Sequence, residues 1–237
     1  MSRSRVLTFA TAVAILGLGV WLMALSPWQN ESGAAAPSGE RVKLPAPRTD
    51  GDTSVEQAMR RRRSVREYRD APLSLAEISQ LLWSAQGITE PRDSRRTAPS
   101  AGATYPLEVY LVGGNVAGLP KGVYKYKPLD HEITRIRDGD VRKELAAAAL
   151  GQSCVEQGAV ALVFSAVYER TTRRYGERAT RYVHMEVGHA AQNVYLQAVP
   201  LGMGTVVVGA FDDERVRRIV GMPDGEHPLY IMPVGKR

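Results

Sequence analysis

The sequence predicts an α+β fold for most of the chain. Helical and strand patterns are mixed along it, without the regular alternation that is typical of a doubly wound parallel sheet. Two short segments, 122–127 and 132–137, flank a four-residue turn and predict a β-hairpin. The chain has 237 residues, of which 44% are hydrophobic and 24% are charged, and the part after residue 52 is long enough for one domain with its own core.

Residues 1–30 are predicted to form a membrane anchor. The run from Val6 to Leu25 carries no charge and is long enough to span a bilayer. Arg3 and Arg5 precede this run, so the positive-inside rule places them in the cytoplasm and the body of the protein outside it. The alternative is a cleaved signal, which would release a secreted protein.

Residues 31–52 are rich in Pro, Gly, Ala and Ser and are predicted to be a tether without a core of its own. The globular part is therefore expected to cover residues 53–237. The two capping boxes Thr53–Glu56 and Ser74–Glu77 predict a helix that runs into an arginine-rich stretch and a second helix over 75–86.

Further helices are predicted from caps and from periodicity. Asp140 and Asp212 are expected to cap helices over 141–150 and 213–220, and the pattern over 178–199 repeats apolar residues near period 3.6. The segment around Tyr175 is charged, and neither a helix nor a strand is predicted there. Strands are predicted at 107–112, 122–127, 132–137, 159–167, 205–208 and 229–234.

The charge balance favours an anionic ligand. The net charge is +6 and the pI is about 9.5, but no motif typical of nucleic-acid binding is present, so nucleic acid is not expected as a partner. The single cysteine, Cys154, cannot form an intramolecular disulfide and is predicted to be a small buried side chain. His184, Glu186 and His189 lack the spacing that puts two histidines on one metal ion, so no metal site is predicted.

Four separated pieces of the sequence suit a phosphorylated flat cofactor. The first is the basic stretch Arg60–Tyr68, and the second is Pro99–Pro106, whose small residues let the backbone approach a ring closely. The third is the Gly-Ala turn at 209–210, which follows a predicted strand, and the fourth is the basic C-terminal end. Read singly, the basic stretch could also be a solvated face, and the small-residue segment an ordinary loop.

Taken in order, these pieces resemble the nitroreductase superfamily and, more narrowly, its SagB/ThcOx-type dehydrogenase branch. The motifs that carry the resemblance are Arg62-Arg63-Ser64-Val65-Arg66-Glu67-Tyr68, Pro99-Ser100-Ala101-Gly102-Ala103-Thr104-Tyr105-Pro106, Gly122-Val123-Tyr124-Lys125-Tyr126, Arg173–Tyr182 and Gly209-Ala210-Phe211-Asp212. The resemblance covers roughly residues 53–237. It implies an FMN-dependent oxidoreductase with a nitroreductase-like α+β fold, in which helices flank a central, mostly antiparallel sheet.

The resemblance also implies a role for each motif. Arg62, Arg63, Ser64 and Arg66 would hold the phosphate and ribityl chain of FMN, with further charge from Lys236. Ser100, Ala101 and Gly102 would lie against the isoalloxazine ring, which belongs either to this subunit or to a partner subunit, because such proteins are typically homodimers. The backbone of Gly209 and Ala210 would lie near N5 and O4 of the ring.

The named branch oxidises azolines in modified peptides and is expected to use a Lys-Tyr pair, which would align near Arg174 and Tyr175. This chain departs from that pattern, because an arginine cannot give up its proton to act as a base. Tyr175 is still a candidate catalytic residue, with Arg174 beside it; the alternative is that Arg174 is a surface charge. Oxidation of peptide azolines is therefore not established by the motifs.

The predicted function is hydride transfer through FMN on a small organic or peptide-derived substrate. The predicted anchor suggests a quinone or another membrane carrier as the electron partner, with NAD(P)H as the alternative. The competing interpretations are a non-catalytic, membrane-tethered flavin-binding module and a basic domain that binds an anionic surface.

Overall fold

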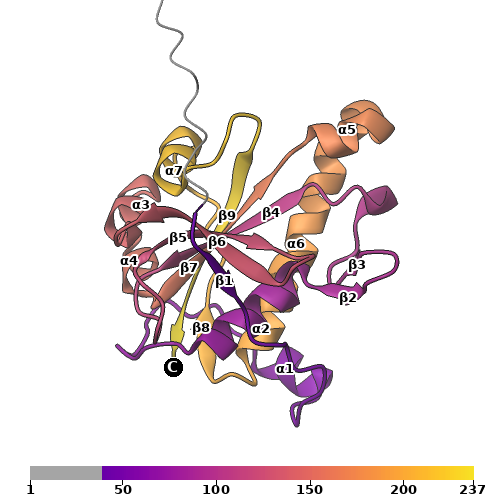
Figure 1. The fold of residues 1–237 in the computed structure, drawn as a ribbon. Helices are drawn as coiled ribbons and strands as arrows, with labels where there is room; N and C mark the ends of the chain where they lie inside the picture. The colour runs from indigo at the N-terminus through magenta and orange to yellow at the C-terminus, as the bar shows by residue number, and fades with distance from the viewer. Residues whose placement is uncertain (1–38) are drawn as a thin grey trace, which may run out of the picture. The chain divides into compact units, whose positions relative to one another are not determined.

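Seven strands form one sheet at the centre of the structure (Figure 1), a computed structural model that describes residues 39–237. The strand order is β1-β6-β5-β4-β7-β9-β8, and every neighbouring pair is antiparallel. The strands are β1 (Arg41–Lys43), β4 (Leu107–Gly113), β5 (Gly122–Lys127), β6 (Glu132–Asp138), β7 (Val160–Ala166), β8 (Met203–Thr205) and β9 (His227–Lys236). A separate small hairpin pairs β2 (Ile88–Glu90) with β3 (Arg95–Arg96). The predicted α+β class with an antiparallel sheet is confirmed.

Helices cover both faces of the sheet (Figure 1). The helices are α1 (Val55–Arg61), α2 (Leu75–Gln86), α3 (Arg142–Ala148), α4 (Ser153–Gln157), α5 (Glu169–Tyr175), α6 (Ala179–Ala198) and α7 (Asp213–Val220). On the central strand β4, Val109 and Leu111 pack toward α2 and α6, whereas Tyr110 and Val112 pack toward α3, α4 and α7. This alternation follows from the period of two in a strand and gives each face its own apolar core.

The capping signals predicted several helix boundaries correctly. Ser74 and Glu77 form the reciprocal capping box that starts α2, and Gly87 ends that helix. The Asp212 side chain accepts a hydrogen bond from the Arg215 amide at the start of α7, which ends at Gly221 in the left-handed conformation. The capping box predicted at Thr53–Glu56 lies one residue too early. The N-cap of α1 is Ser54, whose side chain accepts a hydrogen bond from the Gln57 amide.

The structure also differs from the sequence predictions in other segments. Helix α3 has Val141 rather than the predicted Asp140 at its N-cap. Residues 41–43, predicted to lie in the tether, add β1 to the sheet edge beside β6, and Leu44 is buried behind it. The charged segment 169–175 is the helix α5, and α4 holds the buried Cys154. The strand predicted at 205–208 begins earlier, as β8, because Met203 and Gly204 pair with Lys236 and Gly235 at the end of β9.

The predicted anchor over 1–30 lies outside the described residues. Within residues 39–237, no helix is both long enough and apolar enough to cross a bilayer.

Candidate functional site

The basic stretch that follows α1 runs along the edge of the sheet. The Val65 amide donates to the Thr205 carbonyl at 2.9 Å, and Ser64 forms a parallel bridge with the same residue of β8. Two glycines make this close approach possible. A Cβ at Gly204 would lie 2.5 Å from Cγ1 of Val65, and a Cβ at Gly235 would lie 2.7 Å from Cβ of Tyr68. The sheet edge therefore fixes the backbone that carries the predicted phosphate ligands.

Tyr195 of α6 organises the side chains of this stretch. Its hydroxyl lies 3.2 Å from the Ser64 hydroxyl and accepts a hydrogen bond from the Val207 amide at 2.8 Å. The guanidinium carbon of Arg62 lies 5.2 Å from the centre of the Tyr195 ring, within the range of a cation–π contact. No sequence motif identifies Tyr195, because its position on α6 fits a residue that packs against the core.

The basic side chains of the stretch have different partners. One Nη of Arg63 donates to the carbonyls of Arg60 and Arg62, both at 2.8 Å, and so binds the C-terminal end of α1. Arg66 is exposed and has no hydrogen bond or ion pair within residues 39–237. The Arg66 guanidinium group is therefore free to receive an anion.

Lys236 lies beside this stretch but its charge is already paired. Its ammonium group contacts the Glu77 carboxylate, which also caps α2, and its carbonyl accepts the Arg69 amide at 3.0 Å. Burial acts against ionisation of Glu77, but hydrogen bonds from Lys236 and Ser74 outweigh it and hold the pKa of Glu77 below its usual value. Lys236 would have to leave or share this partner to contribute charge to a phosphate.

Gly209 and Ala210 expose the backbone on which their predicted role depends. Within the described residues, neither N–H donates a hydrogen bond, so both are available to a ligand oxygen or nitrogen. Gln152 donates to the Ala210 carbonyl at 3.3 Å and holds the turn against α4. The four Cα-to-Cα steps from Thr205 to Gly209 span at most about 14 Å, so one short segment links this turn to the basic stretch.

The second group of predicted site residues lies in the Ser100–Tyr105 loop. Three of its residues have positive φ, namely Gly102 at 59°, Ala103 at 53° and Tyr105 at 44°. Left-handed backbone is unfavourable for residues other than glycine by about 1–2 kcal/mol each. Ala103 and Tyr105 therefore hold this conformation because surrounding groups fix it, as is common at functional loops.

Helix α5 supplies several of those groups. Arg170 donates to the Tyr105 carbonyl at 3.0 Å, and the hydroxyls of Thr104 and Thr171 lie 2.8 Å apart. Further along α5, an Nη of Arg174 donates to the Gly102 carbonyl at 3.2 Å. The loop and α5 therefore form one unit, although 65 or more residues separate the partners in sequence.

Tyr175 contacts the same loop. A Cβ at Gly102 would lie 2.6 Å from the Tyr175 hydroxyl and 3.0 Å from Cδ of Arg174. The Tyr175 ring also packs edge-on against Tyr182 of α6, with their centres 5.0 Å apart. Gly102, Arg174 and Tyr175 were proposed separately from motifs, and the structure brings them together.

Glu186 of α6 lies beneath the same loop and was missed as a site residue. It is 2% exposed, whereas His184 and His189 on the same helix are exposed, so the three side chains do not converge on one ion. Burial raises the pKa of Glu186 to about 7, against the opposing effects of Ser100, Arg96 and the Ala101 backbone. A sequence signal existed, because Glu186 falls on the apolar stripe of α6 between Val183 and Ala190.

The predicted residues thus form two groups at different heights on α6. Tyr195 lies beside the basic stretch, and Glu186 lies beside the Ser100–Tyr105 loop. The two residues are nine positions apart on α6, which corresponds to about 14 Å along the helix axis. A flat cofactor with a phosphate tail spans a distance of this order.

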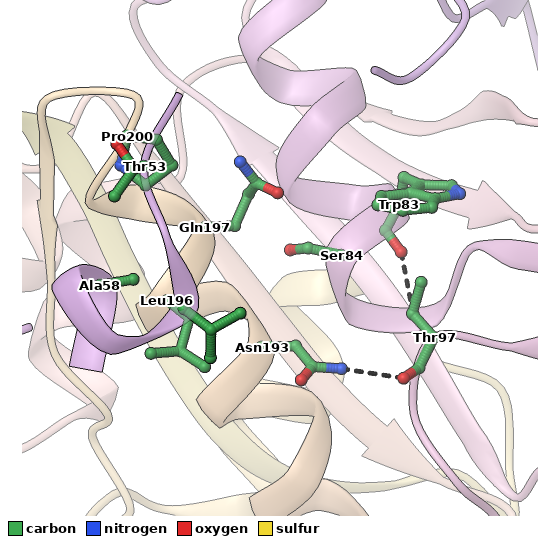
Figure 2. Close-up of a pocket in the computed structure, with 10 residues that line it drawn as sticks. Thr53, Ala58, Trp83, Ser84, Thr97, Asn193, Leu196, Gln197 and Pro200 are labelled. Atoms are coloured by element: carbon green, nitrogen blue, oxygen red, sulfur yellow. Dashed lines mark hydrogen bonds between the residues drawn. The ribbon is translucent and has the colours of Figure 1, made fainter. Parts of the chain in front are cut away.

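A groove lies between α1, α2 and α6 (Figure 2), with a volume of about 250 Å³. Asn193 donates to the Thr97 carbonyl at 3.1 Å, and Thr97 donates to the Trp83 carbonyl at 3.0 Å, so these bonds join α6 to the end of α2. None of the sequence-predicted site residues lines this groove. It separates α1 from the α2–α6 pair and is distinct from both groups.

The sequence pattern of the nitroreductase family matches residues 59–236, which include both groups of site residues. The chain belongs to the nitroreductase family. A Methanocaldococcus jannaschii protein named as a nitroreductase is 50% identical over 199 residues, which are 84% of this chain and 98% of that protein.

Two other relatives support the SagB-type branch of this nitroreductase family. The trifolitoxin operon protein TfxC of Rhizobium leguminosarum is 28% identical over 73% of this chain and 53% of its own length. The microcin B17-processing protein McbC of Escherichia coli is 29% identical over 63% of this chain and 57% of its own length. The chain therefore spans little more than half the length of these two relatives.

Solved structures agree with this assignment. A nitroreductase-family structure from Ralstonia eutropha has a TM-score of 0.74 and 29% identity, covering 84% of this chain and 90% of that chain. The E. coli microcin synthetase McbBCD complex has a TM-score of 0.64 at 24% identity, covering 97% of this chain and 84% of that chain, and shows the fold alone. The family and the nitroreductase-like fold expected from the motifs are confirmed.

Proposed function

We propose that this nitroreductase-family protein is an FMN-dependent oxidoreductase. The observation that supports FMN is the set of unpaired donors at the sheet edge: the Arg66 guanidinium group and the N–H groups of Gly209 and Ala210. These donors suit an anionic phosphate at one end and the polar edge of a flat ring at the other. When bound, the flavin supplies hydride transfer.

The chain's own residues would bind and orient the cofactor. Arg62, Arg66 and the Ser64 hydroxyl would hold the phosphate and ribityl chain, with Tyr195 keeping Arg62 and Ser64 in place. Arg63 would keep the C-terminal end of α1 in place through its hydrogen bonds to the carbonyls of Arg60 and Arg62. Lys236 would add positive charge near the phosphate if it is released from Glu77. Gly209 and Ala210 would donate to the ring, and Ser100, Ala101 and Gly102 would pack against it.

We propose a small organic or peptide-derived substrate that meets the protein at Arg174 and Tyr175. Arg174 cannot be the base, because it remains a cation and its Nη binds the Gly102 carbonyl. Tyr175 would hold or move the proton at its hydroxyl, which lies against Gly102. The relative named for microcin B17 processing favours a peptide-derived substrate. A Vibrio harveyi relative named as an NADPH-flavin oxidoreductase, 30% identical over 44% of this chain and 46% of its own length, favours a small one.

The absorbance spectrum of the purified full-length protein tests the cofactor. We expect a yellow protein with a flavin spectrum, and heat release should yield FMN. A colourless protein that also takes up no added FMN would contradict the proposal. In that case the arginine stretch would be a basic surface, and binding to an anionic polymer should fall steeply with salt.

We expect Arg62→Ala to weaken FMN binding by at least about 1 kcal/mol, roughly fivefold or more, because a charge-assisted hydrogen bond is lost. The dissociation constant can be measured by quenching of flavin fluorescence. The control is Arg41→Ala, which removes an exposed arginine that pairs with Glu132 on the far edge of the sheet. Equal affinities in both variants would count against a phosphate role for Arg62.

We also propose that the protein is a homodimer with the flavin at the subunit interface. Large exposed apolar side chains lie on two of the three helices that line the groove, Val55 and Met59 on α1 and Met185 on α6. Gly188 of α6 has open space where a side chain would project, so a second helix could approach closely there. Sedimentation of the flavin-loaded protein should give twice the monomer mass, and a monomer would contradict the proposal.

The predicted anchor over 1–30 motivates a further proposal, that the domain is held outside the cytoplasm and exchanges electrons with a quinone or another membrane carrier. NAD(P)H is the alternative donor. Turnover with each can be compared before and after removal of residues 1–38. Full turnover with NAD(P)H and none with quinones would exclude the membrane carrier.

A further inference from the structure

The backbone of the Ser100–Tyr105 loop is strained, so neighbouring groups must keep it in place. Glu186 is the neighbouring group that lies in the core. Arg170, Thr171 and Arg174 hold the loop from α5. On the opposite side, the Tyr105 amide donates to the Ser100 hydroxyl at 2.9 Å, which leaves the Ser100 O–H free to donate elsewhere. The Ser100 hydroxyl and the Ala101 amide lie close enough to the Glu186 carboxyl to lower its pKa against the effect of burial.

The environment of Glu186 is unusual for a carboxyl group. The side chain is 2% exposed, and its Oε1 has no hydrogen-bond partner among the described residues. A buried carboxylate normally has an ion-pair partner at contact distance or a complete set of hydrogen bonds. Glu186 has neither, so burying it destabilises the folded protein. A functional role for Glu186 would explain why a carboxyl group stands at this position.

The charges around Glu186 come from neighbouring elements. Arg96 of β3 acts on it directly, and Arg96 itself is influenced by Glu108 of β4 and Arg170 of α5. The Arg96 guanidinium group is held elsewhere, with its carbon 4.5 Å from the centre of the Tyr105 ring and an Nη donating to Gln86 at 2.7 Å. Arg96 therefore attracts the Glu186 carboxylate without forming an ion pair with it.

We propose that Glu186 is a positioning residue that fixes the Ser100–Gly102 segment and thereby couples a proton in the protein interior to flavin binding. This inference rests on the proposed function, because it assumes that the segment contacts the ring. In this proposal the ionised carboxylate attracts the Ser100 O–H and the Ala101 N–H more strongly than a neutral carboxyl group would, because a charge-assisted bond is stronger than a neutral one. The segment is then fixed more firmly, and the flavin meets a preformed surface.

The direction of the coupling follows from this arrangement. The pKa of Glu186 near 7 means that the group changes charge between pH 6 and 8. Flavin affinity should therefore rise over this range, by about threefold or more if one charge-assisted bond is strengthened. By reciprocity, bound flavin favours the ionised form of Glu186 to the same extent.

The test compares Glu186→Gln and Glu186→Ala with the wild-type full chain. The flavin dissociation constant is measured from pH 6 to pH 8 by fluorescence quenching. In the Gln variant, which keeps an acceptor for Ser100 and Ala101 but cannot ionise, we expect flavin binding with no rise in affinity. In the Ala variant we expect about tenfold weaker binding, again independent of pH.

Hydrogen exchange at the Ala101 amide provides a readout that needs no flavin. We expect the Ala variant to lose protection of this amide, and the Gln variant to keep most of it. Glu226→Gln is the matched control, because Glu226 is also buried, at 3% exposed, but binds Lys125, Tyr110 and Ser165 away from the loop. This control should retain the pH response and the protection of Ala101.

The outcomes separate this inference from the proposed function. A wild-type protein that binds no flavin contradicts the proposed function and the coupling together. Flavin binding with the same pH response in Glu186→Gln as in the wild type contradicts the coupling alone. Unchanged protection of Ala101 in Glu186→Ala contradicts the positioning role.

Discussion

We expect Gly102→Val to reduce turnover by at least about tenfold while the protein still folds. The new Cβ would lie 2.6 Å from the Tyr175 hydroxyl and 3.0 Å from Arg174, closer than van der Waals contact allows. Either the loop must move or the Tyr175 hydroxyl and the Arg174 side chain must turn away from it, and a displacement of about 1 Å at a reacting group can cost a hundredfold in rate. Turnover with a nitroarene or a quinone and the flavin affinity measure the effect.

Gly118→Val is the matched control for this prediction. Gly118 has φ of +74°, close to the +59° of Gly102, but nothing lies within 4 Å of the position where its Cβ would be. Both variants therefore carry the strain of a β-branched residue in the left-handed region, and both should lose stability. If Gly118→Val lost as much turnover as Gly102→Val, backbone strain rather than contact with Tyr175 would be responsible.

The contacts at Gly102 show how far the sequence could predict this site. Motifs identified Gly102, Arg174 and Tyr175, but no local pattern says that α5 lies on the loop. The sequence Glu169–Tyr175 has neither an apolar stripe nor a side-chain N-cap. Its helix is supported by tertiary contacts instead, namely Arg170 with Glu108 and Thr171 with Thr104. Such contacts depend on the fold and cannot be read from a seven-residue window.

The elements that were predicted well are those whose signals are local. The Ser74–Glu77 box, the Asp212 cap and the apolar repeat of α6 each act within a few residues, and the structure confirms all three. The strand expected at 205–208 was displaced because a partner strand sets the register, and that partner, β9, lies more than 20 residues away in sequence. Glu186 was weighed only as a metal ligand with His184 and His189, and its place among the apolar residues of α6 was not used.

We expect Lys125→Met to cause the largest loss of stability, about 3–5 kcal/mol at pH 7. The Lys125 side chain is 14% exposed, and its ammonium group pairs with the carboxylate of Glu226, whose side chain is 4% exposed, and with that of Glu108 at 3.3 Å. Arg170 still binds Glu108 in the variant, but Glu226 keeps only the neutral donors Tyr110 and Ser165. A buried charge without a counter-ion remains, and it destabilises the folded state. Thermal unfolding should occur roughly 6–20 °C lower.

Two variants show whether the unpaired charge is the cause. Lys121→Met removes a lysine that is 60% exposed and pairs with Asp140 at 3.2 Å, and an exposed pair of this kind is worth about 1 kcal/mol or less. Adding Glu226→Gln to Lys125→Met should recover most of the lost stability, because no unpaired carboxylate then remains. A double variant as unstable as Lys125→Met alone would show instead that the packing of the lysine stem, and not its charge, holds β5 to the start of β9.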